Sequence, residues 1–175
     1  FQGREVLGLP RKVLDGFRGR HVAFVFQDPL TALTPHLTIE AQMGEVLAHH
    51  FQVKGEAARQ RAIEWLERVR IPEAARRLSQ YPHELSGGMR QRVMIGMAMM
   101  AEPALLIADE PTTALDATVQ AQVLDLIEDL RKDTQAAVAL ITHDMGVIAR
   151  TAPRVAVVRR GEGAEAGAAE KPHSP

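Results

Sequence analysis

The sequence predicts an α/β fold built on a parallel sheet. Two observations support this: three short apolar runs rich in β-prone residues, and helical segments between them. The runs cover residues 21–26, 104–108 and 136–141, and each is followed by polar residues. Short runs that are apolar throughout are typical of strands buried on both faces. Buried strands that alternate with helices indicate an α/β architecture.

Three segments, residues 38–50, 56–70 and 117–132, repeat apolar residues at helical spacing. Side chains three and four positions apart share one face of a helix, so that face is expected to point toward a core. A fourth helix, residues 89–101, is apolar and follows a polar turn. The residues that the spacing turns inward are Ile39, Met43, Val46, Leu47, Ala62, Ile63, Leu66, Val69, Val119, Val123, Leu126, Ile127 and Leu130.

Composition limits the class of protein. The chain has 175 residues, of which 46% are hydrophobic, so it can form one domain with its own core. Its 21 basic and 22 acidic residues nearly cancel, and no dense Lys/Arg run argues for a nucleic-acid partner. Without cysteine, disulfides, thiolate zinc sites and Cys nucleophiles are excluded. The apolar stretches fall short of the roughly 20 residues that span a bilayer.

We expect one domain over residues 1–160, in which residues 28–84 form a helical subdomain, and a disordered tail over residues 161–175. Residues 154–158 favour a last strand. The tail has no large apolar side chain with which to join a core. The chain opens without an initiator Met or a signal pattern, so we expect its natural start to lie upstream.

Polar side chains follow each predicted strand. They are Gln27 after the first, Asp109 and Glu110 after the second, and His143 after the third. Ligands of open parallel sheets bind beyond the carboxyl ends of the strands, so we expect these groups to converge. Asp109 and Glu110 have the form of a Walker B strand, in which one carboxylate holds Mg²⁺ and the next positions the attacking water. The alternative is an ordinary strand followed by a solvated acidic turn.

A second candidate site precedes the helix over residues 89–101. Ser86-Gly87-Gly88 places a hydroxyl and two glycine amides at its N-terminus. Free N–H groups and the helix dipole favour an anion such as phosphate there, and glycine lets the backbone approach closely. The alternative is a loop whose glycines supply positive φ.

In this order and spacing, the motifs resemble those of the nucleotide-binding subunits of ATP-binding cassette (ABC) transporters. The matches are Gln27 with the Q-loop, residues 85–89 with the signature, 105–110 with Walker B, 114–116 with the D-loop and His143 with the switch histidine. The sequence around these motifs, with Met89 after Ser-Gly-Gly, further resembles that of the dipeptide, oligopeptide and nickel importers. The resemblance implies a P-loop NTPase-like parallel-sheet core with an inserted helical subdomain.

The same resemblance implies ATP and Mg²⁺ as ligands. Asp109 and Gln27 are expected near the metal, and Gln27 is also expected to sense the γ-phosphate. Glu110 is expected to position the attacking water, and His143 to steady the γ-phosphate. Catalysis of this kind depends on positioning and charge stabilisation.

A second cassette is implied as well, because two such subunits close head to tail over two ATP molecules. Ser86, Gly87 and Gly88 are then expected to contact the nucleotide held by the partner, and Asp116 to contact the partner across the interface. The other implied partners are two permease subunits, whose contacts include residues 29–35, and an external solute-binding protein. The subunit is expected at the cytoplasmic face of the inner membrane, with no nucleic acid bound.

The chain departs from the family in lacking the Walker A loop, G-x-x-x-x-G-K-[ST]. Gly3 and Gly8 have the glycine spacing, but Leu9 and Pro10 stand where Lys and Ser/Thr belong. We expect truncation, because the downstream motifs are intact, and hence a core without the Walker A strand and helix. As a fragment of an importer ATPase, the chain is expected to be inactive alone. The alternatives are an ABC ATPase of DNA repair or translation, or an inert remnant.

Overall fold

A parallel three-stranded sheet forms the centre of the protein. The computed structural model describes residues 1–3, 5–113, 115–151, 154–159 and 162–168. The sheet has the order β1-β2-β3, with β1 Val22–Val25, β2 Leu105–Asp109 and β3 Ala137–Ile141. Both pairings are parallel. The α/β fold predicted from the sequence is therefore confirmed.

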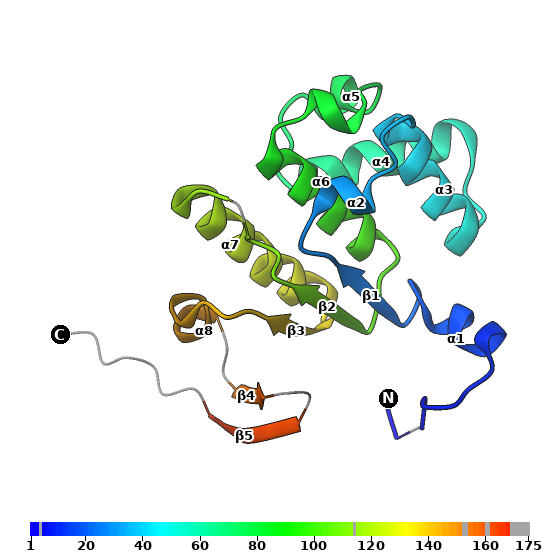
Figure 1. Ribbon diagram of the computed structural model, residues 1–175. Helices are drawn as coiled ribbons and strands as arrows, with labels where there is room; N and C mark the ends of the chain where they lie inside the picture. Colours follow the sequence, from blue (N-terminus) through cyan, green and yellow to red (C-terminus); the bar gives the residue numbers. More distant parts are fainter. Residues whose placement is uncertain (4, 114, 152–153, 160–161, 169–175) are drawn as a thin grey trace.

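Helices separate the strands along the chain. The elements between β1 and α6 are all helical in the described chain, and Figure 1 shows them gathered above the sheet. None of the described helices combines the length and apolar character needed to cross a membrane. The helices are α1 Arg11–Phe17, α2 Pro29–Ala32, α3 Ile39–Phe51, α4 Gly55–Arg68, α5 Ala74–Arg77, η1 Pro82–Glu84, α6 Gly87–Met100, α7 Ala117–Thr134 and α8 Met145–Thr151.

Side-chain caps fix where helices α3, α6 and α7 begin. Thr38 accepts a hydrogen bond from the Ala41 amide at α3, and Ser86 accepts one from the Met89 amide at α6. Asp116 does the same for α7. Each cap satisfies an amide that the helix itself leaves unpaired, which is worth about 1 kcal/mol.

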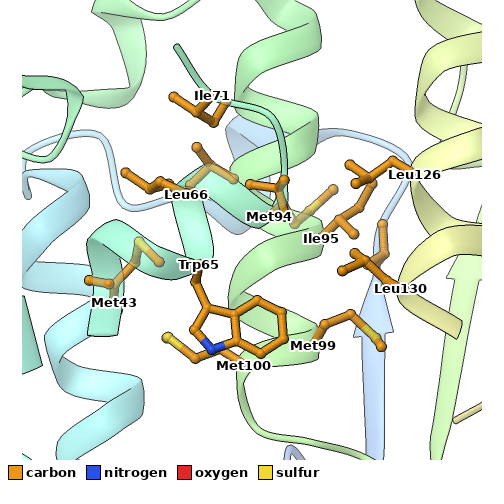
Figure 2. Packing of buried hydrophobic residues seen from close by; sticks show 14 of the residues in the cluster. Met43, Trp65, Leu66, Ile71, Met94, Ile95, Met99, Met100, Leu126 and Leu130 are labelled. Atoms are coloured by element: carbon orange, nitrogen blue, oxygen red, sulfur yellow. The ribbon is translucent and has the colours of Figure 1, made fainter. Parts of the chain in front are cut away.

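Helix α6 is the element against which most others pack. It contacts α2, α3 and α4 as well as α7 and β1. Figure 2 shows its Met and Ile side chains between Trp65 of α4 and Leu126 of α7. Gly96 permits part of this packing, because a Cβ there would lie 3.1 Å from Val69 Cγ1. The residues predicted to point inward are buried or pack against this core.

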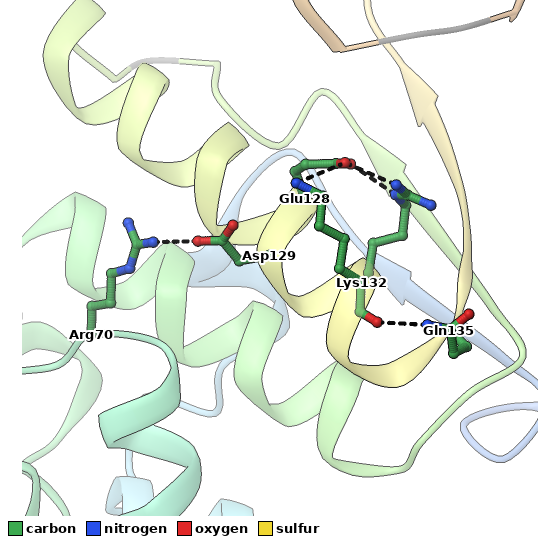
Figure 3. Close-up of polar contacts among 6 residues, drawn as sticks. Arg70, Glu128, Asp129, Lys132 and Gln135 are labelled. Carbon is green, nitrogen blue, oxygen red and sulfur yellow. Dashed lines mark hydrogen bonds and ion pairs between the residues drawn. The ribbon is translucent and has the colours of Figure 1, made fainter.

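Polar contacts also join the turn after α4 to α7 (Figure 3). Arg70 forms an ion pair with Asp129 at 2.5 Å, and Arg92 donates to both the Arg70 carbonyl and the Gln122 side chain. The two charged groups of the ion pair are about half exposed. Exposed pairs of this kind contribute about 0.2–1 kcal/mol each, so apolar packing dominates this junction.

The sheet is buried on one face and open on the other. Ala23 and Val25 of β1 are buried, whereas Phe24 and Phe26 are 44% and 52% exposed and stack with their ring centroids 6.1 Å apart. The register carries this open face to the exposed Ala139 of β3, through Ile107. The expectation that the strands are buried on both faces was thus wrong for the described chain, because no described element covers this side.

The predicted disordered tail over residues 161–175 was wrong for residues 162–168. Strand β5, Glu162–Ala168, pairs antiparallel with β4, Arg154–Arg159, as a separate two-stranded sheet. Antiparallel pairing needs only backbone groups, and small residues permit it without a core to bury. The prediction of disorder used the lack of large apolar side chains, which shows only that the segment cannot join a core. It therefore missed this hairpin. Residues 161 and 169–175 lie outside the described residues.

The two faces of β1 predict opposite effects of mutation. Replacing both Phe24 and Phe26 by Thr is expected to reduce self-association and binding of an apolar dye, with only a modest loss of melting temperature, because about half of each side chain is already exposed. Val25→Ser between them serves as the matched control, and it is expected to destabilise the protein by about 2–4 kcal/mol because Val25 is fully buried. Sedimentation, dye fluorescence and urea denaturation measure these quantities. Equal destabilisation by both sets would show that the aromatic face is covered.

Candidate functional site

The ends of the three parallel strands meet at the carboxylate of Glu110. Gln27, just beyond β1, donates from Nε2 to Glu110 Oε2 at 3.4 Å. His143, just beyond β3, places Nδ1 2.6 Å from Glu110 Oε1. The convergence predicted for these three residues is therefore confirmed. Because an ionised carboxylate can only accept, the proton of the His143–Glu110 contact is on the imidazole.

The backbone holds Glu110 in a strained position. Its φ is +45°, in the left-handed region that residues with a side chain rarely adopt. Its amide donates to the Ile141 carbonyl at 2.9 Å, which ties it to the end of β3. Strain of this kind costs about 1–3 kcal/mol and persists where surrounding contacts enforce it. Here the enforced turn directs the carboxylate to the meeting point of the strand ends.

Thr113 is a member of this cluster that the sequence analysis missed. Its hydroxyl donates to Glu110 Oε2 at 2.7 Å, and its amide donates to the Glu110 carbonyl at 3.1 Å. The available signal was a hydroxyl residue three positions after a strand-end carboxylate, a spacing at which such side chains bond back to a turn.

The hydrogen bond from Thr113, followed by that from His143, lowers the pKa of Glu110 below its usual value. The carboxylate is therefore ionised at neutral pH and able to accept a proton. His143 is 80% exposed, so its ring is free to turn toward a ligand beyond the sheet edge.

Asp109 ends β2 beside this cluster and is exposed. Its carboxylate and the amide oxygen of Gln27 are hard oxygen donors of the kind that Mg²⁺ prefers, so these side chains fit the predicted cation. No group of three or more His, Cys, Asp or Glu suited to a metal occurs among the described residues. Mg²⁺ usually takes one or two protein carboxylates and completes its shell with phosphate and water, a pattern that Asp109 can serve.

The signature residues lie apart from the Glu110 cluster and against α7. The Ser86 hydroxyl is engaged at the Met89 amide, as the cap of α6. A Cβ at Gly87 would lie 3.9 Å from Leu115, and one at Gly88 would lie only 2.7 Å from Val119 Cγ1. Gly88 is thus required for close packing of α6 on α7, whatever ligand it also meets.

Asp116 is not brought to the Glu110 cluster either. Its Oδ1 accepts from the amides of Thr118 and Val119 at 3.1 and 3.0 Å, which makes it the N-cap of α7. A role in helix capping therefore accompanies the partner contact predicted for it.

A large groove among the described residues lies away from the Glu110 cluster. This groove of about 890 Å³ runs between β1, α3 and α6, lined in part by Phe24, His50 and Met97. The Glu110 cluster sits at an open edge of the sheet.

The close approach at Gly88 predicts a rescue. Gly88→Ala is expected to destabilise the protein by about 1–3 kcal/mol because the new methyl group meets the stiff side chain of Val119. Combining it with Val119→Ala should recover most of that loss, since the smaller side chain leaves room. Gly87→Ala is the matched control and should be nearly neutral, because its contact is at ordinary van der Waals distance. Urea denaturation measures these three variants and Val119→Ala alone, and additive losses in the double variant would contradict the steric explanation.

Comparison with known proteins points to one family. The ABC transporter family matches residues 10–113. Over 171 residues the chain is 48% identical to the oligopeptide transport ATP-binding protein OppD of Bacillus subtilis (strain 168), covering 98% of this chain and 48% of that protein. It is 49% identical over 167 residues to the dipeptide transport ATP-binding protein DppD of the same strain, covering 95% and 50%. The chain thus spans about half the length of these two curated relatives.

The fold is also similar to that of a solved cassette. The dimeric ATP-binding cassette MJ0796, in a post-hydrolysis state bound to ADP and Pi, superposes with a TM-score of 0.83 at 28% identity, over 97% of this chain and 72% of the other. Since the family match covers more than half of the chain and the motifs and the fold agree with it, the chain belongs to the ABC transporter family.

Proposed function

We propose that this chain is part of an ATP-hydrolysing subunit that powers import of peptides or a related small solute through an ABC transporter. The observation that carries the proposal is the Glu110 carboxylate, held by Gln27, Thr113 and His143 where three parallel strands end. The names of the Bacillus relatives, an oligopeptide and a dipeptide transport ATP-binding protein, support the solute class.

In this proposal Glu110 accepts a proton from the attacking water. Its lowered pKa keeps it ionised, and the strained turn fixes its direction. His143 holds the terminal phosphate, toward which its exposed ring can turn. Gln27 links the end of β1 to the same carboxylate, so it can report whether the site is filled.

Mg²⁺, when bound, would neutralise charge on the phosphates. Asp109 would hold it, with the amide oxygen of Gln27 beside it. Both side chains are exposed at the sheet edge and supply oxygen donors.

A second cassette completes the proposed site. Ser86, Gly87 and Gly88 lie outside the Glu110 cluster, packed on α7, which supports a head-to-tail arrangement in which they meet the partner's nucleotide. The dimeric state of the similar cassette MJ0796 supports the same arrangement. Asp116, at the start of α7, would lie at this interface.

The remaining partners follow from the proposed role as a transporter subunit. Permease subunits would dock on the helical part of the chain, including residues 29–35, and an external solute-binding protein would deliver the solute. The subunit would then sit at the cytoplasmic face of the inner membrane. Nothing in the charge balance calls for nucleic acid.

Replacing the proposed base tests the assignment. In a longer chain that supplies a phosphate-binding loop ahead of Phe1, Glu110→Gln is expected to keep ATP binding and to slow turnover by roughly 10²-fold or more, the scale of a lost general base. It should also favour the closed dimer with ATP. Glu128→Gln, a surface carboxylate on α7 that pairs with Arg131, is the control and should leave hydrolysis unchanged. Near-normal turnover in Glu110→Gln would remove Glu110 from this role.

The 175-residue chain itself is expected neither to bind nor to hydrolyse ATP appreciably. Its sequence holds no G-x-x-x-x-G-K-[ST] loop, whose amides and Lys carry most of the compensation for phosphate charge. What faces the site is a pair of carboxylates, which repel phosphate unless a cation stands between them. Calorimetric titration with Mg-ATP measures this, and a dissociation constant in the micromolar range would place the nucleotide site elsewhere on the chain.

A further inference from the structure

His143 has two anchors, and only one of them is the Glu110 carboxylate. The residue that follows it, Asp144, accepts a hydrogen bond at Oδ2 from Gln120 Nε2 of α7, at 3.1 Å. The other carboxylate oxygen, Oδ1, accepts from the amides of Gly146 and Val147 at 2.8 and 3.4 Å. Asp144 therefore joins the first turn of α7 to the start of α8, with His143 directly before it.

The hydrogen bonds to Asp144 are strengthened by its negative charge. The hydrogen bond from Gln120, followed by those from Gly146 and Val147, lowers the pKa of Asp144, so it is charged at neutral pH. Hydrogen bonds to a charged acceptor are stronger than those between neutral groups. Gln120 is half-buried on α7, so its side chain has a restricted range of directions.

The turn of α7 that carries Gln120 also meets the signature residues. Val119, its neighbour, is the side chain that Gly88 approaches. Asp116 caps the same turn through the Val119 amide. One helical turn thus contacts the start of α6 on one side and the segment bearing His143 on the other.

We propose that Gln120 is a positioning residue for His143, acting through Asp144. This rests on the proposed function, in which a phosphate meets the His143 ring. The ring must then leave or share its 2.6 Å contact with Glu110, and that anchor weakens. The Gln120–Asp144 hydrogen bond does not involve the ring, so it keeps the backbone of His143 in place when the site is occupied.

A charge-reversal cycle tests the link by ATP hydrolysis in a longer chain that supplies a phosphate-binding loop. Gln120→Glu places two carboxylates together and should lower kcat about three- to tenfold, with the KM for ATP within about twofold. Asp144→Asn alone should have a near-normal kcat, because the new side-chain amide can still form a hydrogen bond with the side-chain amide of Gln120. Gln120→Glu with Asp144→Asn should restore kcat to within about twofold. Gln122→Glu, which adds the same charge two residues away beside Arg92, is the matched control.

Two results would overturn the proposal: a kcat for Gln120→Glu equal to that of Gln122→Glu, or no recovery in the double variant. A general loss of structure would instead lower the melting temperature and would not be rescued by Asp144→Asn. Amide hydrogen exchange at Gly146 and Val147, measured on the 175-residue chain, tests the Gln120–Asp144 hydrogen bond in the absence of nucleotide. Exchange should rise about threefold or more in Gln120→Glu and return in the double variant, and unchanged exchange would contradict this contact. An inactive longer chain would contradict the proposed function and leave that exchange result standing.

Discussion

Parallel pairing of β2 with β1 on one side and β3 on the other is the constraint on which the candidate site depends. In a parallel sheet all carboxyl ends point the same way, so residues that are 83 and 33 positions from Glu110 in the chain reach it across one edge. The hydrogen bond from the Glu110 amide to the Ile141 carbonyl continues the ladder one residue past β2. The turn at Glu110 has a positive φ, and it presents the carboxylate at the edge of the sheet. A shift in register would separate Gln27 and His143 from it together.

Helix α6 links this edge to the helical part of the chain. It packs against α2, α3 and α4 on one side and against β1 and α7 on the other, and glycines mark two of its closest contacts. Gly96 brings it near Val69, and Gly88 brings it near Val119. Close-packed interfaces of this kind leave little room for larger side chains. The signature residues are therefore part of the packing as well as candidates for ligand contact.

The open face of the sheet explains how the described chain relates to its family. Parallel sheets are normally covered on both faces. Here Phe24, Phe26 and Ile141 remain exposed, and the site itself lies at an open edge without enclosing walls. The exposed face of the sheet therefore lies next to the Glu110 cluster.

The sequence by itself determined the elements and the chemistry that each strand end carries. Apolar runs located β1, β2 and β3, helical spacing located α3, α4 and α7, and Gln27, Glu110 and His143 were identified because each follows a strand. These features are local, and local periodicity and residue type suffice to recognise them. Only the tertiary structure decided which groups touch. Thr113 and Gln120 make their hydrogen bonds because a turn and the packing of a helix bring them to their partners. The closeness of Gly88 to Val119 depends on how α6 meets α7. The β4–β5 hairpin forms by backbone pairing, which composition does not encode. Distances between elements arise from packing of the whole chain, so no single segment contains them.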